Sequence, residues 1–281
     1  FYPFAPVVVT FSIENFNSIK KRTKFHKSTI EYIPNRVEKI NQDYDRINKL
    51  KQIHNIDENT IVFLRICRID AYLFSIRQSI DMFLELSKHY NNIVLLIIGT
   101  LVNKNLIHDL RSQFSNHNNR IIFETSPFFT KNANQLNDIG DLIIGTGRGL
   151  MEASFHNKPL LCICKNSKFP IALRRENFIY FSNYNFSERT TIPNIDDKKE
   201  LNAILTILND NTIKNKYLSY YNEINKSNFD LTSSNVKYNK IYKSKKKRAI
   251  YPIDMFIHFL YFVRTLIKIE TKSLINSILP H

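Results

Sequence analysis

Five short apolar runs, separated by longer stretches with helical spacing, constrain the fold of this chain more than any other feature. The runs are 60–69, 92–99, 120–125, 141–145 and 159–164. Strands that are apolar from end to end are buried on both faces, as in parallel sheets covered by helices on each side. Apolar residues at helical spacing fill the stretch 75–90 between the first two runs. The sequence therefore predicts an α/β fold, a doubly wound parallel sheet, followed by C-terminal helices over 196–227 and 228–242.

The sequence on either side of these runs divides the chain into three parts. Residues 7–11 and 29–37 predict strands, and the polar stretch 12–27 predicts a helix with Ser12 as its N-cap. We expect a connecting segment with an entry strand at 1–35, a main domain at 36–242 and a basic amphipathic tail at 243–281.

Composition excludes several classes of protein. With 43% hydrophobic and 12% aromatic residues, the chain is globular rather than disordered. Its three cysteines, Cys67, Cys162 and Cys164, cannot all pair, which argues against a disulfide scaffold, and no second cysteine pair completes a zinc site. The Asp196-Asp197 pair predicts a helix N-terminus rather than a metal-binding motif. We therefore expect neither a metal nor a cofactor.

All five glycines lie within one third of the chain, and three of them form the sequence GTGRG at 145–149. A predicted strand ends there and a helix is predicted over 149–157, so free N–H groups and a positive helix dipole would face any bound anion. Glu152, expected in the first turn of that helix, can accept hydrogen bonds from ligand hydroxyls. An equally supported interpretation is a tight turn whose glycines only permit close packing. The spacing matches neither the dinucleotide fingerprint nor a Walker loop.

A second candidate cation lies in the sequence RICRID at 65–70, where Arg68 follows the strand predicted at 60–69. A guanidinium at the carboxyl end of a strand can bind a diphosphate through paired hydrogen bonds. Taken alone, Arg68 is better explained as a surface arginine. Its functional interpretation depends on the glycine turn, because both segments are expected to leave the same edge of one sheet.

These segments together resemble the carboxyl-terminal, donor-binding half of GT-B glycosyltransferases of family 4. The resemblance covers about residues 7–242 and includes EYIPNRVEK (31–39), LRICRID, NNIVLLIIG and DIGDLIIGTGRGLMEASFHNKPLL, of which the stretch 141–161 is the most specific. It implies a Rossmann-like fold in which Arg68 contacts the donor diphosphate and Glu152 binds the ribose. It also implies that the turn lies against sugar and phosphate, through Gly145, Thr146, Gly147, Arg148 and Gly149.

The chain departs from the family pattern at two positions. Leu73 stands where members usually have a lysine, and Arg77, one helical turn later, can supply that charge. Ile144 stands where members usually have a second glutamate. These departures leave the donor geometry open, including whether the anomeric configuration is retained or inverted.

The resemblance implies transfer of a sugar from a nucleoside diphosphate donor to a glycan or lipid-linked acceptor, in polysaccharide or glycolipid assembly. The chain begins at Phe1, near the point where the acceptor-binding half would end. We therefore expect weak nucleotide-sugar binding and poor transfer by this chain alone. The alternative is a non-catalytic module, a split or decayed transferase that binds a partner or a membrane.

The net charge of +15 is concentrated near the C-terminus, since residues 237–281 hold ten Lys and Arg but two Asp and Glu. The basic run 243–248 and the apolar helix predicted over 250–269 suggest peripheral binding to an anionic membrane surface. Packing of that helix on the missing half explains them equally well. No nucleic-acid module is recognised, and no signal peptide or membrane span is expected. These features favour a cytoplasmic protein, with the inner face of the plasma membrane as its peripheral site.

Overall fold

A computed structural model of the chain describes residues 7–22, 29–101, 110, 112, 114 and 120–243. The chain forms two compact units. One comprises Phe1–Ile33 together with Val236–His281, and the other comprises Pro34–Asn235. The second unit contains the main sheet and every residue proposed above as a ligand-binding residue.

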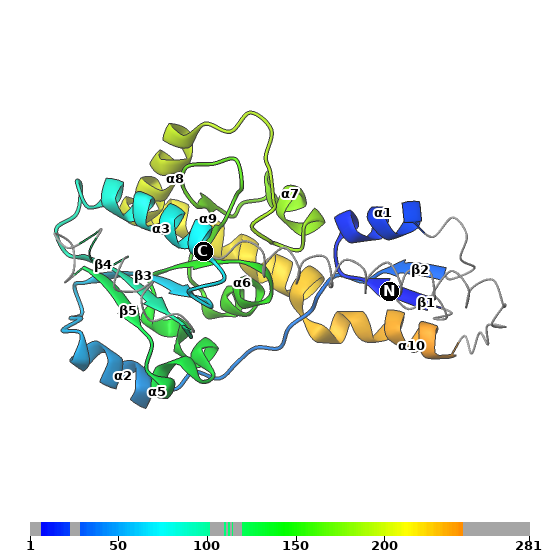
Figure 1. Ribbon diagram of the computed structural model, residues 1–281, viewed down its shortest axis with the longest axis horizontal. Helices are drawn as coiled ribbons and strands as arrows, with labels where there is room; N and C mark the ends of the chain where they lie inside the picture. The colour runs from blue at the N-terminus through cyan, green and yellow to red at the C-terminus, as the bar shows by residue number, and fades with distance from the viewer. Residues whose placement is uncertain are drawn as a thin grey trace, which may run out of the picture. The chain divides into compact units, whose positions relative to one another are not determined.

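The larger unit is built on a six-stranded sheet with the order β5-β4-β3-β6-β7-β8. Figure 1 labels β3, β4 and β5 of this sheet. The parallel strands are β3 (Ile61–Ile66), β4 (Ile93–Ile98), β5 (Ile121–Glu124), β6 (Leu142–Gly145) and β7 (Leu160–Cys162). The edge strand β8 (Ile171–Ala172) is antiparallel to β7. The connection 163–170 is too short for a parallel crossover, which takes roughly a dozen residues, so the chain reverses there. The predicted parallel sheet is confirmed, with this one antiparallel addition.

The order of the strands reverses at the centre of the sheet. The chain runs outward from β3 to β4 and β5, then returns to the other side of β3 as β6 and continues outward to β7. The register aligns Ile66 of β3 with Ile98 of β4, and Arg65 of β3 with Ile144 of β6. In doubly wound sheets, ligands bind outside the carboxyl ends of the strands at such a reversal.

Helices cover both faces of this sheet. The helices α3 (Leu73–Leu86) and α8 (Asp197–Asn209) pack on one face, in a core cluster with Phe63, Ile97 and Ile144. The helix α2 (Tyr44–Ile53) and the 3₁₀ helix η2 (Ala133–Ile139) pack on the other face against Leu64. The helix α6 (Gly147–Ala153) lies on that second face beside Ile143. Consequently α3 and α6, which follow β3 and β6, flank the reversal from opposite faces.

The remaining described elements of this unit are short helices and one longer helix. They are α5 (Pro127–Thr130), the 3₁₀ helix η3 (Ser154–His156), α7 (Phe178–Asn183), α9 (Asn211–Ile224), a π-helical turn η4 (Asn225–Phe229) and the 3₁₀ helix η5 (Leu231–Ser234). Asp196 caps α8 by accepting the N–H groups of Lys198 and Lys199, which confirms the predicted helix start. Asp210 caps α9 in the same way.

The smaller unit contains a parallel pair of strands, β1 (Val7–Thr10) and β2 (Thr29–Tyr32), joined through α1 (Ile13–Arg22). Ser12 Oγ accepts the N–H of Asn15 at 3.1 Å, so the predicted N-cap is confirmed. The helix α10 (Asn235–Lys243) lies in this unit apart from its first residue.

The structure differs from the sequence prediction in a few places. The short elements β8, α5 and α7 were not predicted, because two to six residues are too few to show a period. The helix predicted over 105–114 lies largely outside the described residues, as do the basic run and apolar helix predicted after Lys243. Among the described helices, none is both long and apolar enough to cross a membrane.

Candidate functional site

The two segments that the sequence singles out leave neighbouring strands at the same edge of the sheet. Arg65 of β3 is in register with Ile144 of β6, and the strands are parallel. Arg68 follows three residues after Arg65, and the glycine turn begins directly after Ile144. Both segments therefore border the point where the strand order reverses, as their joint interpretation required.

The three glycines of the turn differ in what each one is needed for. A Cβ added at Gly145 would lie 2.7 Å from Leu150 Cδ1, so this glycine allows α6 to pack closely on its own strand. Gly147 has φ of +53°, a left-handed conformation that favours glycine. A Cβ at Gly149 would meet nothing within 4 Å. Close packing therefore explains Gly145, backbone conformation explains Gly147, and neither explains Gly149.

Glu152 is held in a fixed orientation within α6. It is 5% exposed, its Oε1 accepts Arg148 Nε–H at 2.7 Å, and its Oε2 accepts Asn134 Nδ2–H at 3.0 Å. The helix begins at Gly147 with Thr146 as N-cap, two residues earlier than predicted. Glu152 consequently lies in the second turn and not, as the sequence suggested, in the first, because the left-handed Gly147 already turns the chain into the helix.

Arg68 and Arg77 are both exposed at this edge of the unit. Arg68 lies in the turn between β3 and α3, whose backbone is closed by a hydrogen bond from Ala71 N–H to the carbonyl of Arg68 at 3.3 Å. Leu73 is the first residue of α3 and Arg77 lies one turn later. Within the described ranges, neither arginine side chain takes part in a hydrogen bond or an ion pair.

Two charged residues near this edge, Arg65 and Glu188, were not predicted from the sequence. Arg65 is 0% exposed and donates from Nη2 to Ser75 Oγ at 2.7 Å, and its Nη2 lies 3.9 Å from Oε1 of Glu188. The signal for Arg65 was present, because an arginine between Leu64 and Ile66 interrupts an otherwise apolar strand. Glu188 carried no such signal, since it belongs to a polar loop distant in sequence.

Burial changes the acid–base behaviour of the neighbouring thiol. Desolvation raises the pKa of Cys67, and the positive charge of Arg65 opposes that rise without overcoming it. Burial also raises the pKa of Cys164, beyond the end of β7. These thiols are therefore protonated at neutral pH and are poor nucleophiles. No group of three or more His, Cys, Asp or Glu suited to a metal ion occurs in the part of the chain that is described.

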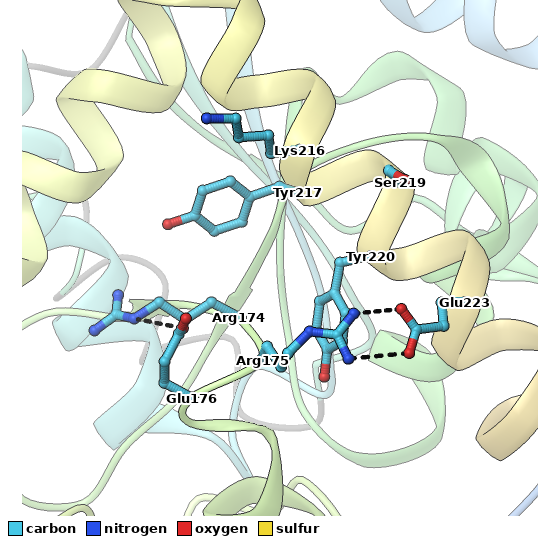
Figure 2. A pocket seen from close by; sticks show the side chains of 8 residues that line it. All are labelled: Arg174, Arg175, Glu176, Lys216, Tyr217, Ser219, Tyr220 and Glu223. Atoms are coloured by element: carbon cyan, nitrogen blue, oxygen red, sulfur yellow. Dashed lines mark hydrogen bonds and ion pairs between the residues drawn. The ribbon is translucent and has the colours of Figure 1, made fainter.

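A cavity of about 410 Å³ lies between α9 and the segment after β8, and no residue of the glycine turn lines it (Figure 2). Its lining residues are Arg174, Arg175, Glu176, Lys216, Tyr217, Ser219, Tyr220 and Glu223. Arg175 forms an ion pair with Glu223 and lies 5.0 Å from the ring centroid of Tyr220. Burial raises the pKa of Tyr220 to about 12, so its hydroxyl is neutral.

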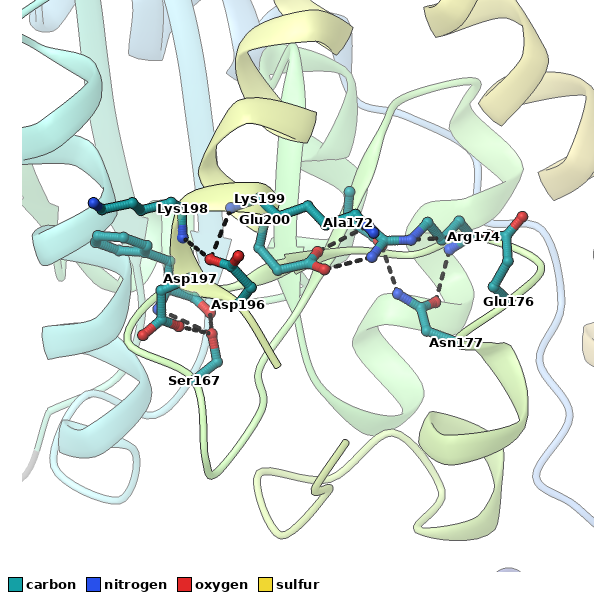
Figure 3. A network of polar contacts seen from close by, with 11 residues as sticks. Ser167, Ala172, Arg174, Glu176, Asn177, Asp196, Asp197, Lys198, Lys199 and Glu200 are labelled. Carbon is teal, nitrogen blue, oxygen red and sulfur yellow. Dashed lines mark hydrogen bonds and ion pairs between the residues drawn. The ribbon is translucent and has the colours of Figure 1, made fainter. Parts of the chain in front are cut away.

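The second arginine of this cavity joins a polar network at the start of α8 (Figure 3). Arg174 Nη1 donates to Oε2 of the buried Glu200 at 2.8 Å, and Glu200 raises the pKa of the arginine. Asp197 accepts the hydroxyl of Ser167 at 2.9 Å. Because Arg174 binds Glu200 and Ser167 binds Asp197, the network links the start of α8 to the segments before and after β8. It includes none of the predicted site residues.

Comparisons with known proteins identify the fold. No protein-family model matches the chain, and no curated sequence matches it. Solved structures match it well: HepE from Anabaena, in complex with UDP and glucose, superposes with a TM-score of 0.61 at 17% identity. A glycosyltransferase from Rickettsia africae gives 0.57 at 18%, and the pneumococcal O-GlcNAc transferase GtfA, in complex with UDP and GlcNAc, gives 0.54 at 11%.

The fold is that of the GT-B glycosyltransferases. The α/β architecture with a mostly parallel Rossmann-like sheet is therefore confirmed. The superpositions cover 85%, 84% and 85% of this chain but 64%, 62% and 45% of the HepE, Rickettsia and GtfA chains. This chain thus spans less than two thirds of the length of these structural neighbours.

Proposed function

We propose that this chain is the donor-binding half of a glycosyltransferase of the family 4 type, which transfers a sugar from a nucleoside diphosphate to a glycan or glycolipid acceptor. One observation carries the proposal: Arg68 and the turn 145–149 follow adjacent parallel strands at the reversal of strand order. A ligand at that edge can contact both segments. The likeness to transferases solved with UDP supports the same choice.

Gly149 adds support that packing does not provide. Neither a positive φ nor a close neighbour requires glycine there, although glycine destabilises a helix interior relative to alanine. A ligand group that approaches the backbone would require it. The exposed guanidinium of Arg68 and the oriented carboxylate of Glu152 then offer a cation for the diphosphate and an acceptor for the ribose hydroxyls.

These residues fit the charge changes of glycosyl transfer. As the glycosidic bond breaks, negative charge grows on the departing nucleoside diphosphate and the sugar acquires oxocarbenium character. The cations of Arg68 and Arg77 would stabilise the leaving group, because they would place positive charge beside the negative charge that develops on it. The acceptor would bind on a part of the enzyme that this chain does not span.

Calorimetry of the 281-residue chain with UDP and with GDP tests the proposal. We expect one of the two nucleotides to bind, and Arg68→Ala to weaken that binding by about tenfold or more, the size of one charge-assisted hydrogen bond. Arg175→Ala is the matched control, since it removes an equal charge at the cavity beside α9, which none of the proposed site residues lines. Absence of binding by both nucleotides, with the chain folded, would contradict the proposal.

The second candidate is a non-catalytic module that keeps the fold and binds a partner. Leu73 and Ile144 favour it, because each replaces a charged residue of the family pattern with an aliphatic one. The same titrations separate the two functions. A folded chain that binds neither nucleotide, and on which Arg68→Ala has no effect, fits the module and not the enzyme.

A further inference from the structure

Arg65 is a fully buried arginine with most of its donors unused. Its Nη2 donates to Ser75 Oγ at 2.7 Å, while Nε and Nη1 have no hydrogen-bond partner in the described part of the chain. A guanidinium stays charged at any physiological pH, and a buried charge without full compensation destabilises the folded state. Ser75 is a neutral partner, so the charge of Arg65 must be balanced by another group.

The carboxylate that faces Arg65 balances its charge incompletely. Oε1 of Glu188 lies 3.9 Å from Nη2 of Arg65, too far for a hydrogen bond, and this oxygen is itself buried without a hydrogen-bond partner among the described residues. Glu188 is not confined to the interior, because its side chain is 25% exposed. The two charges therefore attract each other while each keeps hydrogen-bonding capacity for another partner.

The position of Arg65 places this charge next to the candidate site. It is the penultimate residue of β3, and its partner Ser75 lies in the first turn of α3. The same strand leads after three residues to Arg68, and its register partner Ile144 leads directly into the glycine turn. A buried guanidinium thus lies beneath the edge at which the diphosphate is proposed to bind.

The loop that carries Glu188 also reaches the glycine turn. The carbonyl of Phe186 accepts the N–H of Gly147 at 2.7 Å. Phe186 has φ of +56°, a strained conformation for a bulky residue, and its 3% exposed ring packs against Phe178 and Phe181. The backbone at Phe186 is therefore anchored, whereas Glu188, two residues later and partly exposed, can leave Arg65 by rotating its side chain.

We propose that Arg65 is a further binding residue for the donor's diphosphate, and that Glu188 is the internal anion which the diphosphate displaces. This inference rests on the proposed function. Before the donor binds, Glu188 neutralises the buried guanidinium. An oxygen of the diphosphate then replaces the carboxylate of Glu188 and accepts a hydrogen bond from Nε or Nη1 of Arg65. The released carboxylate turns to solvent. Each donor molecule that binds must therefore compete with an internal carboxylate.

Titration of UDP and of inorganic pyrophosphate into charge variants tests this exchange. We expect Glu188→Gln to tighten the binding of both ligands by about tenfold, since it removes the competing charge, and Arg65→Gln to weaken binding by about tenfold. In the double variant, Glu188→Gln should have no effect, because the competition needs Arg65. Glu223→Gln, which removes a carboxylate paired with Arg175, is the matched control and should leave both affinities unchanged.

The results of these titrations distinguish a failure of this inference from a failure of the proposed function. If UDP binds and Arg68→Ala weakens that binding, but the Glu188→Gln variant binds UDP no more tightly than the wild type, the proposed exchange of Glu188 for diphosphate is wrong. The proposed donor site is then still supported. If Glu188→Gln and Glu223→Gln tighten binding equally, the effect is one of net charge and the exchange is again wrong. If no variant binds either ligand, the proposed function fails as well. Glu188 is partly exposed, so the decisive variant does not depend on whether Arg65→Gln folds.

Discussion

Arg148 donates its Nε–H to Oε1 of Glu152 at 2.7 Å, one helical turn further along α6. The two residues were predicted separately as ligand contacts, and the structure joins them to each other. The side chain of Arg148 is 72% exposed and that of Glu152 is 7% exposed. Solvent therefore reaches the guanidinium of this ion pair but hardly reaches the carboxylate. Asn134 donates to the second carboxylate oxygen and completes a fixed orientation for Glu152.

Glu152→Gln should weaken nucleotide binding without a comparable loss of stability. The amide keeps the size of the side chain, and its oxygen can still accept from Arg148, while Asn134 can turn its own amide oxygen towards the new NH2 group. The change removes the charge that strengthens hydrogen bonds to ribose hydroxyls. We expect about a tenfold loss of UDP or GDP affinity by calorimetry, because hydrogen bonds to charged groups contribute about 1.5–3 kcal/mol. Arg148→Ala is the companion variant, and if it alone weakens binding, the arginine rather than the carboxylate contacts the ligand.

The glycine turn gives a prediction in which stability and binding change in opposite directions. Gly149→Ala should raise the free energy of unfolding by about 0.5–1 kcal/mol, since alanine is favoured in a helix and its Cβ meets nothing within 4 Å. The same change should weaken nucleotide binding if a ligand approaches this backbone. Urea unfolding and calorimetry on one preparation measure both effects.

Gly145→Ala provides the contrast for that variant. Its Cβ would lie 2.7 Å from Leu150 Cδ1 and 3.1 Å from Leu150 Cα, so α6 must shift, and we expect a loss of about 1–3 kcal/mol. Equal stability of the Gly145→Ala and Gly149→Ala variants would contradict the close packing of α6 that explains Gly145. Unchanged nucleotide affinity in Gly149→Ala would leave that glycine without a role in binding.

The five parallel strands of the main sheet could be predicted because each is a short, mainly apolar run, and their parallel order follows from the helices between them. The shared edge of Arg68 and the glycine turn followed from the same pattern. The partners of those residues could not be predicted. Asn134 and Glu188 belong to polar segments with no period, and only the fold brings them to Glu152 and Arg65.

The ion pair of Arg174 with Glu200 should contribute far more to stability than the neighbouring pair of Arg175 with Glu223. Glu200 is 5% exposed, so Arg174→Met leaves a buried carboxylate without its cation, at a cost of about 3–5 kcal/mol. Arg175 and Glu223 are exposed on both sides, and Arg175→Met should leave stability unchanged within error. Urea midpoints of the two variants make the comparison, and equal losses would contradict it.

His156 should make the folded state less stable in mild acid. Its ring is buried, which lowers its pKa below the ordinary value of 6.5, and the nearby Asp138 opposes this without reversing it. The unfolded chain therefore binds a proton at His156 at a higher pH than the folded chain does, so stability falls as the pH drops below about 6.5 and levels off below the folded pKa. His156→Gln removes this contribution. The difference between the free energies of unfolding at pH 7.5 and pH 5.0 should be smaller in the variant than in the wild type. An equal difference in both chains would contradict the prediction, because it would mean that the buried imidazole is protonated as readily as in the unfolded chain.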